Sequence, residues 1–255
     1  MKPFYFGRSS HPLYGVLHEP RGGSRRPGVV VCPPFGQEAL RAHRSLRELA
    51  SRLAEAGFPA LRFDYGGSGD SAGEPEDARL EGWVEDAAAA VEEVRESTAE
   101  PRVVLAGLRL GASVAALAAR RAGGAEALVL WEPVVDGASH LAELRASHAA
   151  WMRDHAPGAA LSPDEVLGFP LTAGLASDLA GLRLDRLEPL PARRALVIWS
   201  EEDLERPTLW KGEAAVEHRA VPPAPVWLHA EGMSRVLVPG ALLEGVVAWL
   251  AGGAA

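Results

Sequence analysis

Short apolar runs alternate with longer amphipathic segments along this chain. Continuous apolar runs predict buried strands, and apolar residues at helical spacing predict helices. The predicted strands cover 3–6, 12–18, 28–33, 59–63, 102–106, 127–131, 194–199 and 224–228. The predicted helices cover 38–56, 80–97, 112–121 and 242–250. This alternation predicts the α/β class, with a leading antiparallel pair and a mostly parallel central sheet that has helices on both faces.

The interval 133–191 interrupts the alternation. It contains helical patches with several Pro and Gly residues but no clear strand. An insertion after the carboxyl end of a strand is where α/β proteins place lids and substrate-binding caps. The interval therefore predicts a helical cap, and extra helical packing over the sheet edge is the alternative.

Length and composition bound the remaining possibilities. The 255 residues carry a net charge of −8, and we expect residues 1–255 to form a single domain. An acidic chain is a poor candidate for nucleic-acid binding. Cys32 is the only cysteine, and neither a secretory signal nor a membrane span is apparent. We therefore expect a cytoplasmic protein, and the sequence does not indicate its oligomeric state.

The segment 103–121 reads as a strand, a glycine-flanked turn and a small-residue helix. Gly107 and Gly111 flank Arg109 in G-L-R-L-G. Glycines on both sides of a central residue permit a sharp turn, which holds that residue above the sheet at the positive end of a helix. A guanidinium is always protonated and cannot attack a carbonyl carbon, so the turn has the geometry of a nucleophile site without its nucleophile.

Three motifs resemble the α/β-hydrolase superfamily over nearly the whole chain. They are the turn around Arg109, the segment LRFDYGGSGDSAG at 61–73, and GVVVCPPFGQE at 28–38, which resembles that fold's oxyanion loop. PPFGQEALRAHR, GLRLGA and LWEPVVDG further resemble a bacterial subgroup of serine-aminopeptidase-like and exosortase-associated hydrolases of the second type.

The resemblance implies positions for the other members of a catalytic triad. Asp203 follows the strand where the acid usually stands, with a solvated acidic turn as the alternative, and Glu132 occupies a second acid position. His229 is a candidate base, although it comes earlier than the family pattern places it, and a surface histidine is the alternative. The oxyanion and substrate-binding positions fall on Phe35, Gly36, Gln37 and Leu110.

Arg109 needs an anion nearby, because an unpaired guanidinium is costly to remove from water. The anion is either a ligand carboxylate, phosphate or oxyanion, or an internal partner, for which Glu132 and Asp203 are the candidates. Cys32 beside the oxyanion loop is a possible replacement nucleophile, with a buried inert thiol as the alternative. We expect Ser113 to point into packing, and Ser68 and Ser71 to bond backbone.

A row of arginines follows the start of the first long helix. Arg41, Arg44 and Arg47 are three residues apart and share a helix face. Together with Arg62 and Arg109 they could converge on an anionic ligand such as a phosphopantetheine or a carboxylate. A solvated helix face that pairs with Glu48 and other acids is the alternative.

Three functional hypotheses follow. The first is a hydrolase or acyl-transfer enzyme that acts on a small or carrier-bound acyl group (ester, thioester or amide) without a serine. The second is a catalytically inactive pseudo-hydrolase that binds or scaffolds. It is favoured because the resembled fold implies a nucleophilic serine at the position that Arg109 occupies. The third is a lyase- or isomerase-like enzyme in which Arg109 anchors an anionic substrate. None of the three requires a cofactor or a metal.

Overall fold

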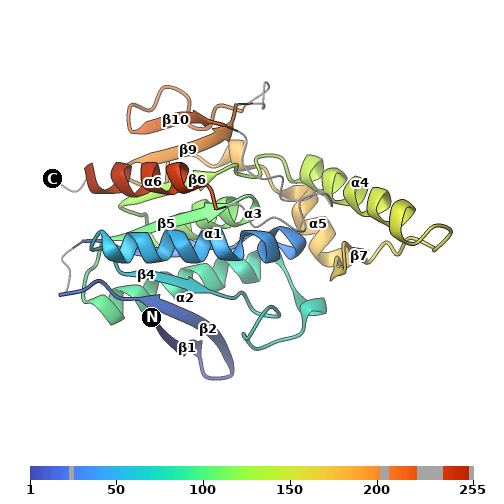
Figure 1. Cartoon of the computed structure of the whole chain (residues 1–255), viewed down its shortest axis with the longest axis horizontal. Coiled ribbons are helices and arrows are strands. Elements are labelled where there is room, and N and C mark those ends of the chain that lie inside the picture. The colour runs from blue at the N-terminus through green and yellow to red at the C-terminus, as the bar shows by residue number, and fades with distance from the viewer. Residues whose placement is uncertain (23–25, 202–206, 223–237, 253–255) are drawn as a thin grey trace.

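A single sheet organises the fold (Figure 1). The structure is a computed structural model that describes residues 1–22, 26–201, 207–222 and 238–252. The sheet has eight strands in the order β1-β2-β4-β3-β5-β6-β9-β10. These are β1 (Lys2–Arg8), β2 (His11–His18), β3 (Gly28–Cys32), β4 (Ala60–Phe63), β5 (Val103–Leu108), β6 (Ala127–Trp131), β9 (Ala195–Ser200) and β10 (Val216–Val221).

The strand directions match the sequence prediction. β1 pairs with β2, and β2 with β4, in antiparallel fashion, whereas β3, β4, β5, β6, β9 and β10 run parallel. The parallel strands β3, β5 and β6 are buried at every position, as a sheet covered on both faces requires. The predicted leading hairpin and mostly parallel sheet are therefore confirmed.

Four helices cover the two faces of the sheet. They are α1 (Gly36–Glu55), α2 (Leu80–Thr98), α3 (Leu110–Arg121) and α6 (Gly240–Gly252). α1 and α6 lie side by side on one face, while α2 and α3 pack on the other (Figure 1). Each pair of helices packs an apolar cluster against its face of the sheet. This packing holds the parallel strands in place, so their carboxyl ends form one fixed edge.

The interval 133–191, called the insert below, lies beyond that edge. It contains α4 (Gly137–His155), a hairpin of β7 (Glu165–Val166) and β8 (Phe169–Pro170), and α5 (Ala173–Gly181). Asp136 caps α4 by accepting the amide of Ser139 at 2.9 Å, and Thr172 caps α5 by accepting that of Leu175 at 3.2 Å. No sequence pattern predicted the hairpin, because two-residue strands are too short to show a period.

One predicted strand is untested, and one observed strand was not predicted. The predicted strand at 224–228 lies outside the described residues, and the edge strand β10 was not predicted. β10 reads VEHRAV and none of its residues is fully buried, so its polar positions hide it from a search for apolar runs. Short 3₁₀ helices at Pro75–Asp77 and Leu184–Arg186 complete the described elements.

Candidate functional site

Arg109 is the single residue between the end of β5 and the start of α3, at the centre of the strand-turn-helix motif. Its φ is 53° and its ψ is −124°, a conformation that costs a non-glycine residue about 1–3 kcal/mol. Its amide donates to the carbonyl of Trp131 at 2.9 Å, and its carbonyl accepts from Ala112 at 3.0 Å. The turn predicted from the sequence is therefore present, and the arginine occupies its apex.

The two flanking glycines are required by close backbone approach. A Cβ atom on Gly111 would lie 2.3 Å from the carbonyl oxygen of Pro33, and one on Gly107 would lie 2.3 Å from that of Gly111. No side chain tolerates such distances without backbone movement. The backbone at the start of α3 therefore lies in close contact with the backbone at the end of β3. This contact fixes the backbone of the turn, and with it the place from which the Arg109 side chain extends.

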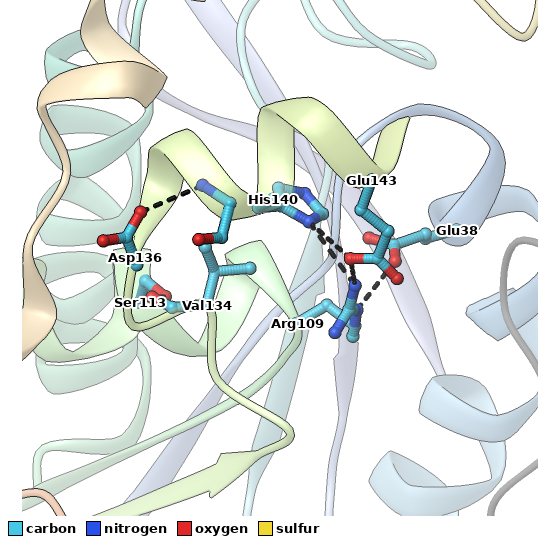
Figure 2. Close-up of polar contacts among 8 residues, drawn as sticks. Glu38, Arg109, Ser113, Val134, Asp136, His140 and Glu143 are labelled. Atoms are coloured by element: carbon cyan, nitrogen blue, oxygen red, sulfur yellow. Dashed lines mark hydrogen bonds and ion pairs between the residues drawn. The ribbon is translucent and has the colours of Figure 1, made fainter. Parts of the chain in front are cut away.

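Two carboxylates hold the Arg109 guanidinium (Figure 2). Its Nε donates to Glu38 Oε1 on α1 at 2.8 Å, and its Nη2 donates to Glu143 Oε2 on α4 at 2.5 Å. Three segments distant in sequence thus meet at one side chain: the helix after the predicted oxyanion loop, the turn, and the insert.

The two ion pairs differ in their exposure to solvent. The Glu38 side chain is 0% exposed and the Glu143 side chain 48% exposed, with Arg109 at 18%. Burial lowers the pKa of Arg109, but the two carboxylates outweigh it and hold that pKa above its ordinary value. For Glu143 burial raises the pKa, yet His140 and Arg109 bring it down to about 2. Arg109 and Glu143 are therefore both charged at neutral pH.

His140 lies beside this pair. Its Nδ1 is 3.4 Å from both Arg109 Nη2 and Glu143 Oε2. The residue is buried, and within the described chain its Nε2 has no hydrogen-bond partner. The Oε2 atom of Glu38 is likewise buried and unpartnered among the described residues. Two polar atoms near the guanidinium thus keep unused bonding capacity.

The structure corrects the predicted internal partner of Arg109. The ion pairs run to Glu38 and Glu143, not to Glu132. Glu132 directly follows β6 with a φ of 46°, and its amide donates to Ile198 at 2.8 Å. The other two predicted triad members, Asp203 and His229, lie outside the described residues.

The predicted oxyanion loop leads from β3 into α1. Phe35 is the N-terminal cap residue of α1, and its ring lies 5.5 Å from Trp83 and 6.3 Å from Phe169 of the insert. Gly36 has a φ of 59°, and Gln37 is partly exposed in the first turn. Leu110 opens α3 and is buried. The loop therefore packs against the insert through aromatic contacts.

The alternative nucleophiles are engaged elsewhere. Ser113 is buried and donates to the carbonyl of Val134 at 2.6 Å (Figure 2). Burial raises the pKa of Cys32 to about 12, which leaves the thiol protonated. Ser68 donates to Tyr65 and Ser71 to Asp64, both at the backbone carbonyl, as expected.

No arginine of the row on α1 is among the charged groups that shift the pKa of Arg109, and a ligand shared between them stays a prediction. Arg41 is partly buried, which lowers its pKa, and Arg44 is exposed. The exposure of Arg44 and Arg47 agrees with the alternative of a solvated helix face, although Glu48 itself pairs with Arg52 at 2.8 Å. No group of three or more His, Cys, Asp or Glu side chains within the described ranges could hold a metal.

Sequence reasoning missed the roles of Glu38, Glu143 and His140. A signal for Glu38 was present, because it falls on the same helical stripe as Ala42, Leu46 and Leu49, which are buried. A carboxylate on an apolar stripe needs a cation. Glu143 and His140 gave no such signal, since the position of α4 over the turn depends on tertiary packing.

Comparisons with known proteins agree with this architecture. In solved structures, the esterase Est1E of Butyrivibrio proteoclasticus with ferulic acid bound is 19% identical with a TM-score of 0.68, over 98% of this chain and 96% of that one. A proline iminopeptidase of Mycobacterium smegmatis is 18% identical with a TM-score of 0.66, over 99% and 98%. An esterase of Pyrococcus furiosus is 17% identical with a TM-score of 0.67, over 100% and 91%. These similarities confirm the α/β-hydrolase fold.

Sequence comparison gives the family. The search of curated proteins returned no match. Across the described residues, no helix has the length and apolar character needed to cross a membrane. The family model for the serine aminopeptidases of the S33 group matches residues 24–178, which include the predicted oxyanion loop, the turn at Arg109 and α4. The chain therefore belongs to the S33 serine aminopeptidase family.

Proposed function

We propose that this family member is a pseudo-hydrolase, a binding or scaffold protein that keeps the hydrolase fold without serine chemistry. One observation carries the proposal: the Arg109 guanidinium occupies the apex of the turn and is held by Glu38 and Glu143. In this proposal the insert acts as a cap, and the ion pair of Glu143 with Arg109 holds the cap against the turn. An arginine cannot supply the attacking electron pair that acyl transfer requires.

The surroundings of Arg109 support this reading over a non-serine hydrolase. Ser113 donates to a buried carbonyl, and the thiol of Cys32 is protonated and buried. A nucleophile near the turn would need a lone pair directed at a substrate and a base to take its proton. Neither side chain meets that requirement.

A second candidate rests on the pair formed by His140 and Glu143. The buried Nε2 of His140 has no partner in the described chain, and its Nδ1 faces the carboxylate of Glu143 at 3.4 Å. A histidine oriented by a carboxylate can carry a proton, so this pair supports a lyase- or isomerase-like enzyme in which Arg109 anchors an anionic substrate.

The experiment compares turnover with covalent labelling. The wild-type protein, the Arg109→Ser variant and the His140→Ala variant are incubated with p-nitrophenyl esters, aminoacyl p-nitroanilides and a fluorophosphonate probe. The pseudo-hydrolase proposal expects no turnover and no label on the wild type. Wild-type turnover, with or without a label, overturns it. Wild-type turnover without a label that is lost in His140→Ala would assign a proton-transfer role to His140 in a hydrolysis, whereas the lyase- or isomerase-like candidate expects no turnover of these substrates.

A further inference from the structure

A second group of cations lies on α1 and the strand β4, and none of its members is among the groups that act on Arg109. We call Arg44, Arg47, Arg62 and His43 the α1–β4 arginine cluster. Arg62 is a partly buried residue of β4, and the other three are exposed on α1. His43 and Arg47 are four residues apart and Arg44 and Arg47 three apart, so the three side chains are neighbours on the helix surface. α1 lies over β4 (Figure 1).

A chain of hydrogen bonds fixes the guanidinium of Arg62. Its Nε donates to Nε2 of the buried His18 at 3.2 Å. The Nδ1 of that ring lies 3.4 Å from Ser51 Oγ, which itself donates to the carbonyl of Arg47 at 3.0 Å. Because Nε2 accepts from Arg62, the ring is neutral with its proton on Nδ1. The chain therefore orients Arg62 without neutralising it.

Among the described residues, Asp64 is the one carboxylate that acts on the guanidinium of Arg62, and no ion pair compensates the cluster. In the part of the chain that the structure describes, none of Arg44, Arg47 and Arg62 forms an ion pair. Asp64 is the acid that acts on Arg62, and its Oδ2 accepts the amide of Asp70 at 3.1 Å. Burial and the neighbouring Arg47 lower the pKa of Arg62, as expected for a cation short of anions.

We propose that the α1–β4 arginine cluster is a binding site for a phosphate monoester, held by the oriented guanidinium of Arg62 together with Arg47 and Arg44. The site is separate from Arg109 and independent of whether the turn is catalytic. Guanidinium groups bind phosphate oxygens through paired, charge-assisted hydrogen bonds, which suits an arginine already fixed by its Nε.

The charge of the cluster selects the ligand. Three guanidiniums and the carboxylate of Asp64 leave two positive charges, with both histidines neutral at pH 7. A phosphate monoester carries close to two negative charges at that pH. A monocarboxylate would neutralise half of the cluster and offers two acceptor oxygens where phosphate offers three. Because the whole chain carries a net charge of −8, this cationic cluster differs in sign from the average charge of the protein and would attract anions locally.

The experiment titrates the full-length protein with inorganic phosphate and with acetate at matched ionic strength. The readout is the ¹⁵N signals of arginine Nε, with the Arg62 signal assigned from Arg62→Lys. The test variant is Arg47→Gln, an exposed position that leaves the His18 hydrogen bonds in place. The control is Arg145→Gln, which removes the same charge from an exposed position of α4.

The expected result is a saturable shift of the Arg62 signal with phosphate and a much weaker response to acetate. Arg47→Gln weakens phosphate binding about tenfold, the effect of losing one charge-assisted hydrogen bond, while Arg145→Gln stays within about twofold of the wild type. The proposal is overturned if phosphate produces no saturable shift, if acetate binds equally well, or if the control variant loses as much affinity as the test variant.

Discussion

Arg109 Nη2 and Glu143 Oε2 lie 2.5 Å apart and join the turn to the insert across 34 positions of sequence. Through this contact, part of the negative charge that balances Arg109 comes from α4, a helix of the insert. The insert is also tied at a second point, where Arg79 before α2 and Asp178 of α5 form two hydrogen bonds of 2.7 Å. Both ties can be tested separately.

Glu143→Gln removes the half-exposed ion pair. We expect a loss of about 1 kcal/mol in the free energy of unfolding at pH 7, a small value because solvent screens the carboxylate. The pKa of Glu143 is about 2 in the folded state against an ordinary 4.5, so its contribution is present above pH 4.5 and is lost as pH falls towards 2. Urea denaturation at pH 7 and pH 3 measures this.

Glu165→Gln is the control for Glu143, since it removes an exposed carboxylate of the insert that has no ion pair in the described chain. Its unfolding free energy should match that of the wild type at both pH values. An equal loss in both variants would mean that the ion pair with Arg109 contributes nothing specific.

Glu38→Gln affects the buried partner and should cost more. Removing one charge from a buried pair leaves the other without its partner, which costs about 3 kcal/mol. The double variant Glu38→Met with Arg109→Met removes both charges and should unfold at a higher urea concentration than either single Met variant. A double variant less stable than both would contradict the pairing.

Gly111→Ala should prevent correct folding of the turn. The added methyl group would lie 2.3 Å from Pro33 O and 2.4 Å from Cys32 O, both of them backbone atoms that cannot move independently. We expect a loss of more than about 4 kcal/mol, in the range reserved for severe core disruption. Gly82→Ala is the matched control, because nothing lies within 4 Å of its Cβ position, and it should fold normally. Thermal unfolding distinguishes the two.

This glycine illustrates what sequence could predict. Gly107 and Gly111 have a local meaning, since a residue without a Cβ marks a close approach wherever it occurs beside a buried strand. The mostly parallel sheet followed from apolar runs for the same reason: each run is a property of consecutive residues. For the seven predicted strands that lie in the described residues, no bound differs from the prediction by more than two residues.

The partners of Arg109 depend on residues that meet only after folding. Glu38 and Glu143 are 71 and 34 positions away, and no local pattern connects either one to the turn. The sequence required an anion beside Arg109, because a buried guanidinium needs one, but several acids satisfied that requirement equally. The tertiary packing of α1 and α4 determines which of these acids reach Arg109.

Asp178→Asn should weaken the tie between α2 and α5. The pair is largely exposed on the Arg79 side, so we expect a loss below about 1 kcal/mol that disappears in 1 M salt. Hydrogen exchange of the α5 amides should rise in this variant, and exchange of α4 should rise with Glu143→Gln. Combining the two changes should raise exchange in both helices. Unchanged exchange in the combined variant would show that apolar contacts alone hold the insert.

His18 makes stability depend on pH. Burial, followed by Arg62, lowers its pKa from 6.5 to about 4. Between these values the unfolded chain binds a proton that the folded chain does not, so stability is full above pH 6.5 and falls as pH drops towards 4. The loss should reach about 3 kcal/mol at most. His18→Gln removes this dependence, and equal pH profiles for the two proteins would contradict it.

The burial of Cys32 has a practical consequence. The chain has one thiol, and it lies on the central strand β3, whose neighbours are β4 and β5. The thiol belongs to the apolar cluster that the sheet shares with α2, α3 and the insert, so a thiol reagent reaches it only after this cluster opens. The rate of modification of one native side chain thus measures how often that cluster opens.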